Sequence, residues 1–429
     1  MNFSDSEIVA SVMTDEGYAC TEDIKSADII FVNTCSIREH AETRVRKRLQ
    51  YFKSLKKKKP DLIIGLLGCM ADRTKTALME EEKLLDLVAG PDSYRHLPHL
   101  LEQVGNGRRA IDTILSVNET YADITPVRLD SNGVSAFISI MRGCEYYCSY
   151  CVVPSTRGQE RSRDAVTIVN ETRDLFEKGY REVTLLGQNV NSYQWDTGDK
   201  IITFAQLLEQ VAGVNPLMRI RFATSHPKDI SDELLHTLAR YRNLCKSIHL
   251  PVQSGSNHML DLMNRKYTRE DYMERIQAIR QILHGCTIST DIIAGFCNET
   301  EEDHRETLSL MEWVGFDAAY MFKYSERPQT LAADTLIDNI PENIKDRRLK
   351  EIIDRQQKLS LNSNQKDIGK IFEILIEGKS KRSDNQNFGR NSQNKVAVFV
   401  KTESGPGEYV DVKITGATSA TLLGEVIRR

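Results

Sequence analysis

Short apolar runs alternate with helical segments along about three quarters of the chain, and this alternation restricts the fold more than any other feature. Asp28–Asn33 and Leu62–Leu67 are apolar over nearly their whole length. Such runs are typical of strands that are buried on both faces of a parallel sheet. Because helical segments separate the runs, the sequence predicts an α/β fold.

Residues 1–118 form the first predicted domain, a parallel α/β sheet with a third strand near 87–89. The stretch Ser4–Glu7 has the pattern of a capping box, which predicts that a helix begins there. A βαβ unit should open with a strand, whereas this sequence opens with that helix. We therefore expect that the first strand of the sheet is missing from the sequence as given.

Residues 130–360 repeat the alternation and form the second predicted domain. Six strands are expected, at 137–140, 182–186, 219–222, 247–250, 289–293 and 318–322. Eight strands would close a full barrel, so six predict a partial (β/α)₆ barrel. A long helix is expected at 341–365.

Residues 363–429 have short strands separated by Gly, Ser and Asn turns, which predicts a small all-β barrel. From residue 361 onward there are eleven Lys and Arg against eight Asp and Glu, a net charge of +3. A mildly basic small barrel beside an enzyme domain is suited to holding RNA.

Composition excludes several classes of protein. The 429 residues carry a net charge of −4, so any nucleic-acid site must be a local patch. No apolar run approaches the length of a membrane span, and the N-terminus has no signal-peptide pattern. Nine cysteines cannot all pair, so a disulfide framework is not expected. We predict a cytoplasmic protein that does not bind membranes.

Three cysteines lie within eight residues, directly after a predicted strand. Cys144, Cys148 and Cys151 have the spacing C-x₃-C-x₂-C. Zinc would need a fourth ligand, and no second pair of cysteines or nearby histidine supplies one. Three thiolates on a four-iron cluster leave one iron open, and that iron could bind a substrate. The loop therefore favours an iron–sulfur cluster over zinc and over three buried thiols.

Cys35 and Cys69 each follow a predicted buried strand immediately. Both should lie at the carboxyl edge of the sheet, where open α/β sheets bind ligands. Two thiolates at neighbouring strand ends can share a metal, so we expect both residues to be metal ligands.

The cysteine spacing, with Tyr150 before the last cysteine, resembles the radical S-adenosylmethionine (SAM) enzymes. Longer motifs resemble the methylthiotransferases within that superfamily, and they lie at 33–42, 68–71, 152–158, 185–193 and 249–256. The amino-acid sequence of residues 34–39 is similar to that of the tRNA branch of the family, the MiaB type. The order of an α/β domain, a radical-SAM barrel and a C-terminal TRAM barrel also fits.

The resemblance implies a transferase that methylthiolates C2 of N6-isopentenyl-adenosine at position 37 of tRNA. It implies SAM and two [4Fe-4S] clusters, one on Cys144, Cys148 and Cys151. The auxiliary cluster would use Cys35, Cys69 and a third cysteine that this sequence lacks. The implied partners are the modified tRNA, an electron donor and a sulfur donor, and a monomer is expected. No catalytic residue beyond the cluster ligands is implied.

Further site residues are expected by analogy with the family. The SAM pocket is predicted to involve Tyr150, Gly187, Gln188, Asn189, Thr224, Ser225, Gln253 and Asp291. RNA contacts are predicted at Lys56, Lys57, Lys58, Lys379, Arg382 and Lys395. For the lysine run, a solvated charged face is the plainer interpretation.

Three alternatives stay open at this point. The chain could belong to the methylthiotransferase branch that acts on ribosomal protein S12, or it could be a cluster-deficient paralogue that only binds tRNA. A zinc-bearing RNA-binding protein is the third alternative.

Overall fold

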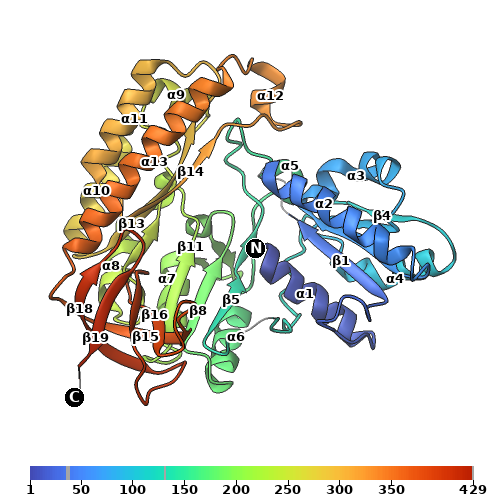
Figure 1. Cartoon of the computed structure of the whole chain (residues 1–429), viewed down its shortest axis with the longest axis horizontal. Coiled ribbons are helices and arrows are strands. Elements are labelled where there is room, and N and C mark those ends of the chain that lie inside the picture. The colour runs from blue at the N-terminus through green and yellow to red at the C-terminus, as the bar shows by residue number, and fades with distance from the viewer. Residues whose placement is uncertain (35–38, 130–131, 428–429) are drawn as a thin grey trace. The chain divides into compact units, whose positions relative to one another are not determined.

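The computed structural model describes residues 1–34, 39–129 and 132–427 (Figure 1). The chain forms two compact units, namely residues 1–129, 141–163 and 327–330, and residues 130–140, 164–326 and 331–429. None of the helices in the described residues is long and apolar enough to cross a membrane.

The first unit is built on a four-stranded parallel sheet in the order β1-β2-β3-β4, with β1 at one edge. The strands are β1 (Ile29–Thr34), β2 (Ile63–Gly68), β3 (Leu87–Ala89) and β4 (Ala110–Asp112). The helices are α1 (Asn2–Asp15), α2 (Glu39–Lys56), α3 (Cys69–Glu81) and α4 (Leu97–Gly105). The predicted parallel α/β sheet is confirmed, and β4 is a strand that the sequence did not predict.

Apolar side chains cover both faces of this sheet. One cluster joins Leu49 and Phe52 of α2 to Ile64 of β2, and a second joins Ile8 of α1 to Leu87 of β3. Burial on both faces explains why the strands are continuous apolar runs, as expected for a parallel sheet.

The predicted capping box at the start of α1 is wrong. The helix begins at Asn2, so Ser4 lies inside it and does not cap it. Ser4, Asp5 and Glu7 are all buried. Glu7 pairs with Arg128 at 2.9 Å, and Asp5 pairs with two arginines that are described below. These polar residues therefore serve tertiary ion pairs and not the helix terminus.

The second unit contains six parallel strands in two three-stranded sheets, β5-β8-β11 and β12-β13-β14. An isolated parallel bridge between Ile220 and Leu244 lies between the two sheets. The strands are β5 (Ser135–Ser139), β8 (Glu182–Leu186), β11 (Arg219–Ala223), β12 (Ser247–His249), β13 (Thr287–Ala294) and β14 (Ala318–Lys323). The main helices are α6 (Ala165–Glu177), α7 (Phe204–Ala212), α8 (Asp232–Arg240), α9 (Asn257–Leu262), α10 (Arg269–Ile282) and α11 (Glu301–Val314). The six expected parallel strands are confirmed.

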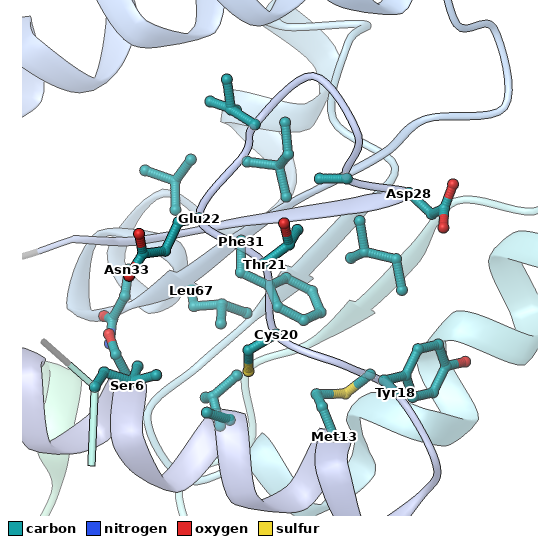
Figure 2. A pocket seen from close by; sticks show the side chains of 18 of the residues that line it. Ser6, Met13, Tyr18, Cys20, Thr21, Glu22, Asp28, Phe31, Asn33 and Leu67 are labelled. Carbon is teal, nitrogen blue, oxygen red and sulfur yellow. The ribbon is translucent and has the colours of Figure 1, made fainter. Parts of the chain in front are cut away.

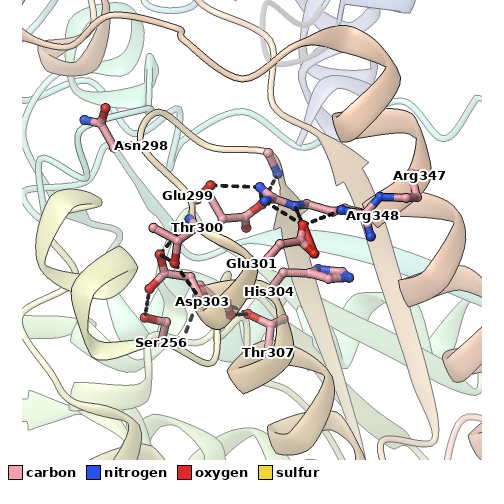
Figure 3. A network of polar contacts seen from close by, with 12 residues as sticks. Ser256, Asn298, Glu299, Thr300, Glu301, Asp303, His304, Thr307, Arg347 and Arg348 are labelled. Carbon is pink, nitrogen blue, oxygen red and sulfur yellow. Dashed lines mark hydrogen bonds and ion pairs between the residues drawn. The ribbon is translucent and has the colours of Figure 1, made fainter.

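Helix α13 (Glu342–Gln365) is held to this unit by polar contacts (Figure 3). Arg348 donates to the Glu299 carboxylate at 2.8 Å and to its carbonyl at 2.9 Å. His304 of α11 lies 2.7 Å from Glu351, from Nε2 to Oε2. These contacts fix α13 against α11 and against the loop that precedes it.

Residues 371–426 form a closed five-stranded barrel in the order β15-β16-β17-β19-β18. The strands are β15 (Ile371–Lys379), β16 (Gln386–Arg390), β17 (Val396–Val400), β18 (Tyr409–Ala417) and β19 (Leu422–Val426). The predicted small all-β barrel is confirmed. Arg219, the first residue of β11, donates to the Arg390 carbonyl at 2.6 Å. This contact places the small barrel at the amino end of β11, and not at the carboxyl end of that strand.

Candidate functional site

The three-cysteine loop is closed at its base by backbone contacts. It follows β6 (Met141–Arg142), which pairs with β7 (Arg161–Ser162), and it leads into α5 (Val153–Arg157). Gly143 has a φ of +81°, and a Cβ there would lie 1.8 Å from the Gln159 carbonyl oxygen. The Cys144 N–H donates to the Gly158 carbonyl at 3.2 Å. Only glycine fits this position, so the sequence fixes where the loop starts.

The donor set of this loop fits an iron–sulfur cluster. Cys144, Cys148 and Cys151 are half-buried thiols that form no disulfide. In the described part of the chain, no three His, Cys, Asp or Glu side chains converge on a single metal ion. Around one zinc ion, thiolate sulfurs would lie about 3.8 Å apart. In a four-iron cluster each thiolate binds a different iron, so the sulfurs need not converge in that way.

Cys69 is the buried first residue of α3, at the carboxyl end of β2. In the register of the sheet, Thr34 at the end of β1 pairs with Gly68 at the end of β2. The next residue along each strand is a cysteine. Cys35 itself lies outside the described residues.

A buried guanidinium contacts the Cys69 sulfur. Arg157, at the end of α5, is 3% exposed, and its Nε–H donates to Cys69 Sγ at 3.2 Å. Its Nη2 donates to Asp5 Oδ2 at 2.6 Å. The segment that follows the three-cysteine loop is thereby joined to the end of β2.

Asp5 is shared between two arginines. Arg142 Nη1 donates to Asp5 Oδ1 at 2.9 Å, and Arg142 also stacks on Tyr121, with 4.9 Å from Cζ to the ring centre. Burial alone would raise the pKa of Asp5, but the charges of Arg157 and Arg142 lower it to about 2. Arg161 extends the cluster through Asp92 at 2.8 Å. The three-cysteine loop is thus held within its unit by buried ion pairs.

The sequence analysis did not single out Asp5, Arg142 or Arg157. A charged residue is rarely buried unless it is paired, and pairing between residues more than 130 positions apart leaves no local signal. Arg157 is within one of the quoted motifs, but the residue pattern alone did not indicate what it contacts.

The predicted SAM-pocket residues of the second unit lie at or near carboxyl ends of barrel strands. Gly187, Gln188 and Asn189 follow β8, Thr224 and Ser225 follow β11, Gln253 follows β12, and Asp291 lies in β13. The Val190 N–H donates to the Thr224 carbonyl at 3.0 Å, and Gln253 forms a bridge with Ile292. The fold therefore brings these residues to one edge, whereas Tyr150 belongs to the other unit.

Two of these residues have unusual backbone conformations. Thr224 has a φ of +71° and Gln253 a φ of +72°. A positive φ is disfavoured for any side chain, and most strongly for a β-branched residue such as threonine. Such strain concentrates at functional sites.

Unsatisfied polar atoms lie at the same edge. Gln188 Oε1 and Ser225 Oγ are buried without a hydrogen-bond partner among the described residues. Asn189, in contrast, donates to Asp229 and accepts from the His226 N–H at 3.0 Å. His249 Nε2 lies 3.5 Å from Asp291 Oδ1. Gln188 and Ser225 are therefore available to a ligand, while Asn189 supports the loop.

The predicted RNA-contact residues differ in their surroundings. Lys57, Lys58, Lys379 and Arg382 are exposed. Lys56 pairs with Asp86, and Lys395 Nζ lies 2.7 Å from Asp367. The first four side chains present their charge to solvent, whereas Lys56 and Lys395 are engaged within the protein.

A cavity of about 880 Å³ runs along the edge strand β1 (Figure 2). Apolar side chains line much of it, among them Met13 of α1 and Phe31 of β1. Asn33, Cys20 and Glu22 add polar atoms to its wall. Among the described residues, none of the predicted SAM-pocket or cluster residues lines this cavity.

Sequence comparisons cover the whole chain. The profile of the Radical SAM superfamily matches residues 138–311, the uncharacterized protein family UPF0004 matches 1–90, and the TRAM domain matches 365–427. The tRNA-2-methylthio-N(6)-dimethylallyladenosine synthase of Amoebophilus asiaticus is 58% identical, over 100% of this chain and 91% of that protein. The synthase of the same name from Parabacteroides distasonis is also 58% identical, over 100% of this chain and 93% of that protein.

Solved structures show the same fold at low identity. The radical S-adenosylmethionine methyltransferase TsrM from Kitasatospora setae superposes with a TM-score of 0.57 at 16% identity, covering 77% of this chain and 72% of that one. The cobalamin-dependent S-adenosylmethionine radical enzyme OxsB gives a TM-score of 0.51 at 13% identity, covering 83% and 59%.

Proposed function

The chain belongs to the tRNA-2-methylthio-N(6)-dimethylallyladenosine synthases, a family of radical SAM enzymes. From this membership we propose which residues bind the clusters, SAM and tRNA. Its reaction is the methylthiolation of tRNA. We assign the reacting position to C2 of N6-isopentenyl-adenosine 37. The similarity over the full chain to synthases of this name carries the assignment. This similarity does not favour the methylthiotransferase branch that acts on ribosomal protein S12.

Cys144, Cys148 and Cys151 are proposed to hold a [4Fe-4S] cluster with one open iron for SAM. When bound, this cluster supplies the one-electron chemistry that breaks an unactivated C–H bond. Acid–base groups of the protein cannot break such a bond. The protein's part is to present three half-buried thiols from one loop, and the Gly143 turn and the Asp5 ion pairs keep that loop in place.

Cys35 and Cys69 are proposed as ligands of the auxiliary cluster of the family. The pairing of Thr34 with Gly68 supports this proposal, because the residues that precede the two cysteines in the sequence end neighbouring strands of the sheet. The Arg157 contact with Cys69 Sγ is the kind of outer-shell hydrogen bond that accompanies metal-bound thiolates.

The barrel edge is proposed to bind SAM and the target base. Gln188 and Ser225 each have a buried polar atom that can bond to a ligand. The strained residues Thr224 and Gln253 fix the backbone around them. Gly187, Asn189 and Asp291 complete the proposed pocket at this edge, and Tyr150, which belongs to the other unit, is proposed separately as a SAM contact. The base must leave the anticodon-loop stack, which costs a few kcal/mol.

tRNA binding is assigned to two exposed basic patches, Lys57 with Lys58 and Lys379 with Arg382. Contacts of this kind bind phosphates and orient the substrate without reading its sequence. We further propose three domains, 1–118, 130–360 and 363–429, in a cytoplasmic monomer. An electron donor and a sulfur donor are required.

The proposal is tested by anaerobic reconstitution of the full chain, followed by iron and sulfide counting. About eight irons per chain are expected, together with 5′-deoxyadenosine from SAM and methylthiolated adenosine in tRNA. Replacing Cys148 by Ala should abolish SAM cleavage, while C286A should leave it unchanged. SAM cleavage that persists in C148A would contradict the ligand assignment.

A further inference from the structure

The proposed function explains the contact of Arg157 with Cys69 but leaves the rest of its guanidinium group unexplained. It is a buried guanidinium with three sets of N–H groups. Nε–H donates to Cys69 Sγ at 3.2 Å, and Nη2 donates to Asp5 and to Asn2 Oδ1, at 2.6 and 3.5 Å. Nη1 has no hydrogen-bond partner among the described residues, although it is buried.

A buried donor without a partner costs free energy, so its presence requires an explanation. Asp5 does not supply one, because it accepts from Nη2 of Arg157 and Nη1 of Arg142 and does not bond to Nη1 of Arg157. Arg142 also lies 3.5 Å from Asp92, which pairs with Arg161, so three guanidinium groups face two carboxylates and the cluster beside Cys69 has an excess of positive charge. An anionic acceptor at this position would satisfy both the spare N–H groups and the charge.

We infer that Arg157 is a positioning residue for the group held at Cys69, binding the Cys69 thiolate through Nε and a small sulfur anion of the hydrosulfide class through Nη1. This inference rests on the proposed auxiliary cluster and adds to it a protein donor for the anionic sulfur. Nothing in it requires Arg157 to gain or lose a proton.

Arginine suits this role better than lysine. A guanidinium presents donors in a fixed plane, so it can bond to a thiolate, a carboxylate and a further anion at once. A lysine ammonium would keep the charge without that geometry. Since hydrogen bonds to cluster sulfurs and local charge set reduction potentials, loss of Arg157 should make the auxiliary cluster harder to reduce.

The test compares Arg157→Gln and Arg157→Lys with the matched control Arg142→Lys. Arg142 is as deeply buried and pairs with the same Asp5, but it is not bonded to Cys69. After anaerobic reconstitution, the potential of the auxiliary cluster is measured by EPR-monitored titration, and iron release to a chelator is timed. Sodium sulfide is the anion probe, and its effect on the auxiliary EPR signal is recorded.

R157Q should lower the potential, speed iron release roughly 10- to 100-fold and remove the sulfide-dependent change in the signal. R157K should lie between R157Q and the wild type, and R142K should keep the wild-type potential and sulfide response. Unchanged potential and sulfide response in R157Q, with about eight irons bound, would overturn the inference but leave the proposed function intact. About four irons in the wild-type chain would instead overturn the auxiliary site and this inference together.

Discussion

Asp5 and Arg142 form an ion pair at 2.9 Å in which both side chains are buried, although 137 residues separate them. The pair joins the first helix to the strand that leads into the three-cysteine loop. Replacing Asp5 by Asn should cost about 3–5 kcal/mol of unfolding free energy, because two buried guanidinium groups lose their carboxylate. Urea denaturation measures the change.

Asp123→Asn is the matched control for Asp5→Asn, since Asp123 is 72% exposed and also pairs with an arginine, Arg95. Its loss should cost less than about 1 kcal/mol. Equal costs for the two variants would show that burial of the Asp5 pair contributes nothing to stability.

The Asp5 carboxyl predicts how stability depends on acid. Its pKa in the folded chain is about 2, against about 3.9 in an unfolded chain. Because the folded value is the lower one, ionised Asp5 stabilises the fold above about pH 4, and this contribution is lost as the pH falls through about 2. The free energy of unfolding of the wild type should therefore approach that of D5N between pH 4 and pH 2. A constant difference across that interval would contradict the prediction.

A comparison of Gly68 with Gly17 separates the stability cost of backbone strain from the cost of close packing. It has a φ of +88°, and a Cβ there would lie 2.5 Å from Asn33 Oδ1 and 2.8 Å from the Thr34 carbonyl oxygen. Gly17 has nearly the same φ, +87°, with no atom within 4 Å. Gly17→Ala should cost about 1 kcal/mol, from backbone strain alone.

Gly68→Ala should cost more than G17A and should also reduce the iron count from about eight to about four. The reason is that the added methyl group pushes apart the strand ends that precede Cys35 and Cys69. Iron analysis and urea denaturation of both variants provide the measurements. A full iron count in G68A would show that the two strand ends need not stay together.

Local patterns predicted much of the architecture. The runs at 28–33 and 62–67 mark strands because burial on both faces makes them largely apolar, and the structure places strands at Ile29–Thr34 and Ile63–Gly68. The same reasoning missed β4 and β6, which are two or three residues long and have no room for a pattern. It also misjudged Glu7, whose carboxylate pairs with the distant Arg128 and not with its own helix terminus.

In the site as well, local sequence predicted some features, whereas contacts between distant residues were missed. Spacing predicted the three-cysteine loop, because its members are close in sequence, and strand ends predicted the position of Cys69. The contact between Arg157 and Cys69 spans 88 residues, so no window of sequence contains it. The predicted RNA contact at Lys395 looked like any other lysine until its pairing with Asp367 was visible.

Replacing Thr224 by glycine should stabilise the fold but weaken the binding of SAM. Glycine adopts a φ of +71° without strain, so Thr224→Gly should raise the unfolding free energy by about 1 kcal/mol. If the strained turn shapes the pocket, SAM affinity should fall in the same variant, as measured by equilibrium dialysis of the reconstituted protein. Asn264→Gly is the control, since Asn tolerates its φ of +57° and Asn264 lies outside the proposed pocket. Tighter SAM binding in T224G would contradict a role for this turn.

The exposed lysines predict a salt-dependent contact with tRNA. Lys57 and Lys58 are exposed, and no ion pair occupies them within the described residues. Each phosphate contact contributes about one unit to the slope of log affinity against log salt, so Lys57→Gln with Lys58→Gln should lower that slope by up to about two. Lys395→Gln should instead reduce stability and leave the slope unchanged, because its ammonium already pairs with Asp367. Filter binding at several salt concentrations measures the slopes, and an unchanged slope in the double variant would exclude this patch from the tRNA site.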